Sequence, residues 1–252
     1  MTTIATASAP EPSRSTDRRD VPPDPAAFAH VDTWVFDLDN TLYPRHTDLF
    51  SQISDRMTQY VQALLELPRE EAYRVQKRYY REHGTTLAGL MANHGIDPNE
   101  FLEAVHDIDY SWVKPDPALG KAIEALPGRK LIFTNGDVGH AERAAQALGV
   151  LDHFEAIFDI VAADLIPKPA AATYDKFVAD HGVDPKRAAM FEDLPRNLVA
   201  PHALGMRTVL IVPNNLAGAA FADWEEDGRD DPTVDYVTDD LGAFLAAVRQ
   251  GA

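Results

Sequence analysis

The chain has 252 residues, of which 45% are hydrophobic, enough to fill the core of one ordinary domain with a smaller inserted unit. Its 23 basic and 40 acidic residues give a formal net charge of −17, which argues against a nucleic acid polymer as partner. Because the chain has no cysteine, disulfides, thiolate nucleophiles and cysteine-based metal sites are excluded.

The ends of the chain and its apolar runs indicate where it resides. Residues 1–28 are rich in Pro, Ala, Ser and Thr, a composition that predicts a disordered tail. The N-terminus lacks the apolar core of a secretory signal, and no apolar run approaches the roughly 20 residues of a membrane helix. We therefore expect a cytoplasmic protein with no membrane partner, whose oligomeric state the sequence leaves open.

The next segments alternate between strand and helix patterns. Residues 33–37 are short, apolar and end at polar turn residues, which predicts a strand covered on both faces. Helical spacing follows in residues 139–148, 172–181 and 241–248. This alternation predicts an α/β fold with a doubly wound, mostly parallel sheet of five or six strands. The further strands expected are residues 130–134, 157–161, 188–192, 208–212 and a short 234–237.

A long insertion separates the first two predicted strands. Its apolar residues recur at helical spacing, and Pro68 and Asp97-Pro98 are typical of helix starts or breaks. We expect residues 44–114 to form a small all-helical cap, and residues 29–43 and 115–252 to form the α/β core. Ligands bind at the carboxyl ends of parallel strands, so this cap should lie over the site like a lid.

Polar residues fall where the predicted strands end. Parallel strands bring these ends to one edge of the sheet, where the carboxylates need a cation to offset their mutual repulsion. Hard oxygen ligands favour Mg²⁺ over zinc or copper. The residues are Asp37 and Asp39 at the carboxyl end of the first strand, Thr134 and Asn135 at the end of the second with Gly136 next, Lys168 in the loop after the third, and Glu192 and Asp193 at the end of the fourth.

Four motifs in this order resemble the haloacid dehalogenase superfamily over about residues 32–213. They are Asp-Leu-Asp-Asn-Thr at 37–41, Thr-Asn-Gly at 134–136, Lys-Pro at 168–169 and Glu-Asp-Leu-Pro-Arg-Asn at 192–197. The resemblance implies a phosphatase with Asp37 as nucleophile, Asp39 as general acid/base, and Mg²⁺ bound by Asp37, the Asp39 carbonyl and Asp193. Thr134 and the backbone N–H groups near Asn135 and Gly136 would hold the phosphate, and Lys168 would pair with it and with the nucleophile.

Two details refine the resemblance. Dehalogenases as a group lack an acid/base Asp at the place of Asp39, so this residue favours phosphate esters over haloacids. The fourth motif departs from many relatives, with Glu192 in place of Gly or Asp and Asn197 in place of a second Asp. We expect Glu192 and Asn197 to act indirectly, through water or through Lys168.

The extension Leu-Tyr-Pro at 42–44 resembles the pyrimidine 5′-nucleotidase branch, which implies a pyrimidine nucleoside 5′-monophosphate as the small phosphorylated substrate and places Tyr43 beside it. A sugar phosphatase or phosphomutase on the same scaffold, or a non-catalytic phospho-aspartate receiver, remain as alternatives. The four His residues of the insert lack a metal-ligand spacing and are expected on the surface or within the cap. Base stacking or core packing are both open to Tyr79, Tyr80, Tyr110 and Trp112.

Overall fold

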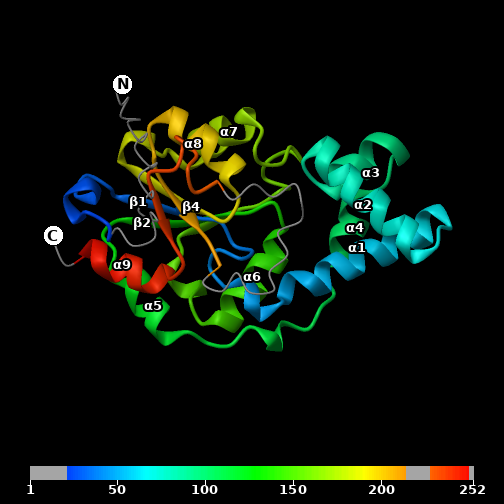
Figure 1. The fold of residues 1–252 in the computed structure, drawn as a ribbon, viewed down its shortest axis with the longest axis horizontal. Coiled ribbons are helices and arrows are strands. Elements are labelled where there is room, and N and C mark those ends of the chain that lie inside the picture. Colours follow the sequence, from blue (N-terminus) through cyan, green and yellow to red (C-terminus); the bar gives the residue numbers. More distant parts are fainter. Residues whose placement is uncertain (1–21, 214–227, 250–252) are drawn as a thin grey trace, which may run out of the picture.

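The computed structural model describes residues 22–213 and 228–249, which form a parallel sheet with helices on both faces (Figure 1). Six strands of these residues have the order β3-β2-β1-β4-β5-β6, so the winding reverses beside β1, where ligands bind in such folds. The predicted doubly wound parallel sheet is confirmed. The strands are β1 (Thr33–Phe36), β2 (Arg129–Phe133), β3 (Ala156–Phe158), β4 (Ala188–Glu192), β5 (Arg207–Ile211) and β6 (Tyr236–Thr238).

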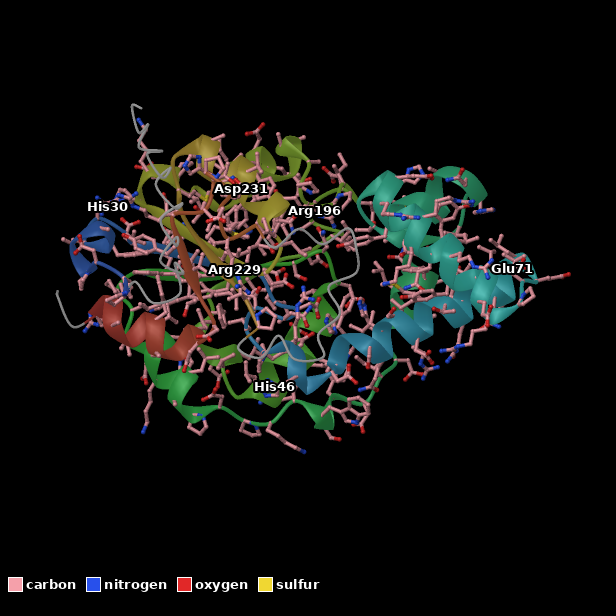
Figure 2. All side chains as sticks on the ribbon, in the orientation of Figure 1. His30, His46, Glu71, Arg196, Arg229 and Asp231 are labelled. Carbon is pink, nitrogen blue, oxygen red and sulfur yellow. The ribbon has the colours of Figure 1, made fainter. Side chains whose placement is uncertain are left out.

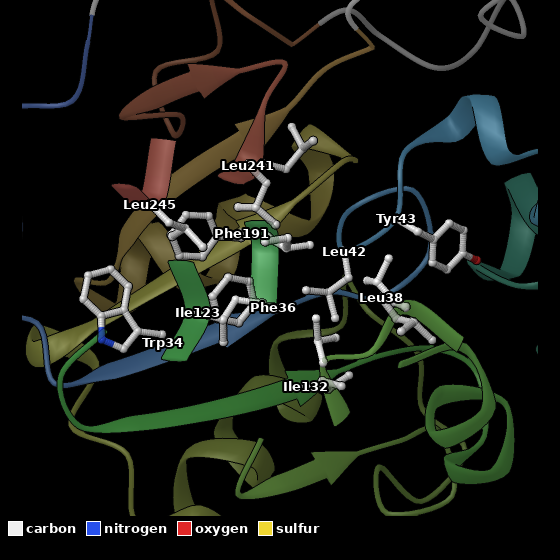
Figure 3. Packing of buried hydrophobic residues seen from close by; sticks show 14 of the residues in the cluster. Trp34, Phe36, Leu38, Leu42, Tyr43, Ile123, Ile132, Phe191, Leu241 and Leu245 are labelled. Atoms are coloured by element: carbon white, nitrogen blue, oxygen red, sulfur yellow. The ribbon is translucent and has the colours of Figure 1, made fainter. Parts of the chain in front are cut away.

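Two hydrophobic clusters hold the helices against the sheet. On one face Phe36 and Phe191 stack with ring centroids 4.7 Å apart, and Ile123 and Leu245 close over them (Figure 3). Near-continuous apolar strands are needed for this arrangement because both faces are covered. The first face carries α5 (Pro117–Glu124), α6 (Val138–Leu148) and α9 (Leu241–Arg249), and the other carries α7 (Ala171–His181) and α8 (Val199–Leu204).

Strand β3 is shorter than the predicted 157–161 and ends at Phe158. The carboxylate of Asp159 accepts the backbone N–H of Val138 at 2.9 Å and of Ala162 at 2.8 Å. These bonds turn the chain out of the sheet one residue after the strand, which an apolar pattern alone does not reveal.

The insertion forms four helices that lie to one side of the sheet (Figure 1). They enclose a third hydrophobic cluster, to which the core adds Ile160 and Leu165 from the segment after β3. Pro68 precedes the second of them, and the Asp97 side chain caps the fourth by accepting the N–H of Asn99 at 2.8 Å, as the sequence predicts. The helices are α1 (Leu49–Leu65), α2 (Arg69–His83), α3 (Thr86–His94) and α4 (Pro98–Val105).

The predicted N-terminal tail is described only from residue 22 onward, and its end is ordered. Pro25–Phe28 forms a 3-10 helix, and the buried ring of Phe28 lies 6.1 Å from Trp34 and 5.8 Å from Phe244, centroid to centroid. This one aromatic side chain gives the segment enough apolar surface to join the core. Among the described helices, none is long and apolar enough to cross a membrane.

Candidate active site

The end of β1 presents two carboxylates to one cavity. The N–H of Asp37 still bonds to the carbonyl of Phe191 at 2.9 Å, so this residue continues the sheet pairing. The chain then turns through Asn40, whose φ of 63° lies in the left-handed region that Asn tolerates better than most residues. Asp37 and Asp39 both line the cavity as a result.

Lys168 lies at the centre of the site and is 1% exposed. Its ammonium Nζ donates to Asp37 Oδ1, Glu192 Oε1 and the carbonyl of Phe133, each at 2.8 Å. Burial opposes the charge, but the two carboxylates outweigh it and raise the pKa of Lys168. The side chain therefore stays cationic beside Asp37, where the sequence predicted it.

Asn135 holds the loop that carries Lys168. Its side-chain Oδ1 accepts the backbone N–H of Lys168 at 2.8 Å, and its Nδ2 donates to the Lys168 carbonyl at 3.2 Å. The predicted phosphate contact would come from the backbone at residues 135–136, because the amide side chain is engaged in this pairing. Asn135 thus acts on the site by fixing the position of Lys168.

Three carboxylates gather at the carboxyl ends of β1 and β4. Oxygens of Asp37, Glu192 and Asp193 lie within 4.8 Å of one another, an arrangement that could hold a metal ion. Both oxygens of Glu192 are already bonded: Oε1 to Lys168 and to Asn197 Nδ2 at 2.6 Å, and Oε2 to the N–H of Leu194 at 2.8 Å. Asp37 and Asp193 are therefore the carboxylates free to meet a cation directly, and Glu192 and Asn197 act through Lys168.

The electrostatics of this cluster match a divalent cation. Burial, opposed by Lys168 and reinforced by Glu192 and Asp39, raises the pKa of Asp37 to about 7. Burial and the neighbouring carboxylates Glu192 and Asp37 also raise the pKa of Asp193, although Arg45 Nη2 lies 3.0 Å from its Oδ2. The cationic side chains thus leave negative charge uncompensated, and all the donors are hard oxygens.

Asp39 is held through one carboxylate oxygen. Its Oδ1 accepts the hydroxyl of Tyr43 and contacts His140 Nε2 at 2.9 Å. Burial acts to raise the pKa of Asp39, but His140 and the Tyr43 hydroxyl outweigh it and hold this pKa below its ordinary value. Tyr43 is fully buried within the hydrophobic cluster (Figure 3). Its hydroxyl bonds to Asp39 and it is not among the residues that line the cavity, so it supports the carboxylate and does not contact the substrate site.

Sequence reasoning missed His140 and Arg45. His140 lies on the first turn of α6, where the helical pattern marks its neighbours Ala141 and Ala144 as core residues. A polar residue on that apolar face was the only signal available. Arg45 follows the Leu-Tyr-Pro extension at 42–44, and only the turn after Asn40 brings it to Asp193.

Thr134 and Gly136 form the expected close turn after β2. The N–H of Gly136 donates to Thr134 Oγ1 at 3.0 Å, and Thr134 is buried. A Cβ added at Gly136 would lie 3.0 Å from His140 Cδ2 and 3.4 Å from Thr134 Oγ1. The glycine therefore permits a close backbone approach in the site.

The cavity has a volume of about 180 Å³ and lies between core and insert. Of the four candidate aromatics only Tyr80 lines it, and the Arg196 guanidinium lies 4.6 Å from the centre of its ring. Arg196 is on the side of the core that faces the insert (Figure 2). Tyr79 is buried and bonds to His94 at 2.7 Å, while Trp112 is exposed.

Comparison with known proteins identifies the family. The model of the haloacid dehalogenase-like hydrolases matches residues 31–205, more than half of the chain. The chain belongs to this hydrolase family. The match covers both β1 and β4, and with them the four carboxylates described above.

This haloacid dehalogenase-like hydrolase is also similar in sequence to a yeast protein. Phosphate metabolism protein 8 of Saccharomyces cerevisiae is 28% identical over 205 residues, which are 75% of this chain and 63% of the yeast protein. The match thus spans less than two thirds of that relative's length.

Solved structures share the fold at low sequence identity. The L-2-haloacid dehalogenase of Xanthobacter autotrophicus has a TM-score of 0.57 at 17% identity, covering 88% of this chain and all of that one. A phosphatase of the family from Thermococcus onnurineus has a TM-score of 0.56 at 18% identity, covering 87% and 97%. These identities support the architecture alone.

Proposed function

We propose that the chain is a Mg²⁺-dependent phosphomonoester hydrolase that works through a phospho-aspartyl intermediate on Asp37. The observation that carries the proposal is the pair Asp37 and Asp39 at one cavity, with Lys168 bonded to the first and Tyr43 and His140 to the second. One carboxylate is thus prepared for attack and the other for proton transfer.

In the first step an oxygen of Asp37 attacks phosphorus, and the bond from phosphorus to the ester oxygen breaks. The departing alkoxide takes a proton from the carboxyl group of Asp39. Asp39 holds this proton when substrate is bound, because the negative charge of the phosphate dianion disfavours the charged carboxylate. Asp39 then removes a proton from water, and the resulting nucleophile displaces phosphate from Asp37. Mg²⁺ held by Asp37, Asp193 and the Asp39 carbonyl would neutralise phosphate charge.

The choice of phosphate esters over haloacids rests on Asp39. Dehalogenases of the family, as a group, lack an acid/base Asp at this position. Halide is a stable leaving group and needs no proton, whereas the alkoxide of a phosphate ester does. The name of the yeast relative, phosphate metabolism protein 8, refers to phosphate and supports a phosphorylated substrate. The likeness to dehalogenase structures concerns the fold and does not oppose this choice.

For the substrate we propose a pyrimidine nucleoside 5′-monophosphate. The support is the resemblance of residues 42–44 and a cavity whose insert side is largely apolar, with Tyr80 in its wall. A flat base could lie against such a wall while the phosphate reaches Lys168. The apolar lining residues of the insert include Ile53, Met57, Leu87, Phe101, Leu102 and Val105.

A phosphate-release screen with Mg²⁺ tests both levels of the proposal. We expect turnover of UMP and CMP, its loss in Asp37→Asn, and its retention in the exposed control Asp152→Asn. Equal rates on UMP, CMP and simple sugar phosphates would remove the pyrimidine assignment and leave the phosphatase. Retained turnover in Asp37→Asn would overturn the nucleophile, and phosphorylation without turnover would identify a receiver module.

A further inference from the structure

The carboxylate of Asp39 is held by two neighbouring side chains that the acid/base step itself does not require. Both hydrogen bonds that the described residues give this carboxylate arrive at Oδ1, from Tyr43 and from His140. Its other oxygen, Oδ2, is thereby left for the substrate. A carboxylate fixed in this way presents one defined oxygen to the departing ester group.

His140 is itself immobilised on three sides. It is 0% exposed, its Nδ1 lies 3.0 Å from the Tyr110 hydroxyl, and its ring stacks on His106 with centroids 4.4 Å apart and planes 9° from parallel. Its backbone N–H donates to Asp137 Oδ1 at 2.7 Å. The imidazole therefore has one orientation in which Nε2 meets Asp39.

The supports of His140 are also connected to one another. His106 Nδ1 lies 2.5 Å from Asp137 Oδ2, and the Tyr110 hydroxyl donates to the His106 carbonyl at 3.2 Å. His106 is the C-cap residue directly after α4 and Tyr110 begins the 3-10 helix Tyr110–Trp112, so both come from the chain that returns from the insert. Asp137 and His140 come from the start of α6 in the core.

We propose that His140 is a positioning residue that, with Tyr43, holds Asp39 Oδ1 so that Oδ2 serves the leaving group. The inference rests on the proposed function and adds residues that assist its proton transfer. Displacement of a reacting group by about 1 Å slows a reaction about 10²-fold. General acid catalysis contributes about 10²- to 10⁴-fold to the rate. A poorly held Asp39 should therefore slow only those esters whose leaving group needs a proton.

The test compares two substrates through kcat/KM, which reports the steps up to the first phosphoryl transfer. UMP expels an alkoxide that needs the proton, whereas 4-nitrophenyl phosphate expels a stable phenolate that does not. In His140→Phe, which keeps a flat ring against His106, we expect kcat/KM to fall about 10²-fold for UMP and less than about 3-fold for 4-nitrophenyl phosphate. His140→Gln, which keeps a donor near Nε2, should recover much of the loss.

Two further variants provide a second test and a control. Tyr43→Phe removes only a hydroxyl from the core and should give the same selective loss on a smaller scale, even if His140→Phe folds poorly. The exposed His202→Phe should change neither substrate. Parallel losses on both substrates, or no loss on UMP, overturn the inference. A wild-type chain inactive on both esters overturns the proposed function as well.

Discussion

Replacement of Lys168 by methionine tests the electrostatic centre of the site. The ammonium is buried and bonded at 2.8 Å to Asp37, to Glu192 and to the carbonyl of Phe133. Methionine keeps most of the apolar stem but leaves both carboxylates without their cation. Removal of one partner from a buried ion pair costs about 3–5 kcal/mol of stability. We therefore expect the free energy of unfolding of Lys168→Met at pH 8 to be about 3–5 kcal/mol lower than that of the wild type.

The cost should shrink as the pH falls. Burial raises the pKa of Asp37 to about 7, above its unfolded value of about 3.9, so the folded state binds more protons and loses stability as pH rises between these values. Without the ammonium, the pKa of Asp37 moves higher still and this loss extends to higher pH. The difference between wild type and Lys168→Met is therefore larger at pH 8 than at pH 5.

Urea unfolding in a metal-chelating buffer at the two pH values measures this difference. Glu192→Gln added to Lys168→Met should restore part of the stability, since it removes one uncompensated charge. Lys176→Met, which breaks only surface pairs with Asp164 and Asp180, should change the free energy of unfolding far less than Lys168→Met does. A cost below about 1 kcal/mol for Lys168→Met at pH 8, or one independent of pH, would refute the reasoning.

Three other predictions concern metal, pH and packing. Mg²⁺ at about 100 times its dissociation constant should add about 2.7 kcal/mol to the unfolding free energy of wild type and of Asp152→Asn but not of Asp193→Asn; an equal gain in all three contradicts the metal site. Burial lowers the pKa of His106, so the contribution of His106 to wild-type stability is complete above the unfolded value of about 6.5 and is lost as the pH falls below it, opposite in sign to the contribution of Asp37. In denaturant unfolding, the stability at pH 5 relative to pH 8 should be higher in His106→Gln than in the wild type, and an identical pH dependence of the two would count against this origin. A Cβ at Gly89 would lie 2.3 Å from Tyr79 Cβ, so Gly89→Ala should lower the thermal midpoint, at a cost of about 1–3 kcal/mol. Gly242→Ala, with its nearest atom at 3.5 Å, should not lower it, and equal effects of the two would disprove the packing argument.

Much of the fold follows from local patterns. The apolar runs around Trp34 and Met190 are too short for helices and too continuous for half-exposed strands, so a buried parallel sheet is the arrangement that satisfies them. The insert likewise shows its helices through spacing and through breaks such as Pro68. Strand β3 was predicted too long because its end depends on the Asp159 side chain and its partners across the turn.

The candidate site likewise has a part that the sequence predicts and a part that it does not. Asp37, Lys168 and Asp193 lie together as the strand order requires, because parallel strands bring their carboxyl ends to one edge. The contacts of Asn135 and Tyr43 differ from the expected ones, since each uses its side chain on a neighbouring site residue. The hydrogen-bond partner of a side chain depends on its rotamer and on where distant segments of the chain are placed. Residue spacing in the sequence predicts neither of these.

Periodicity and chain order are enough to predict the alternation of strand and helix, the inserted helical unit and the polar residues at the strand ends. The bonds of Glu192 to Lys168 and Asn197, and the contact of His140 with Asp39 from 101 positions away, become visible only in the folded chain. Most buried polar atoms need a partner, and packing in three dimensions determines which partner each of them meets.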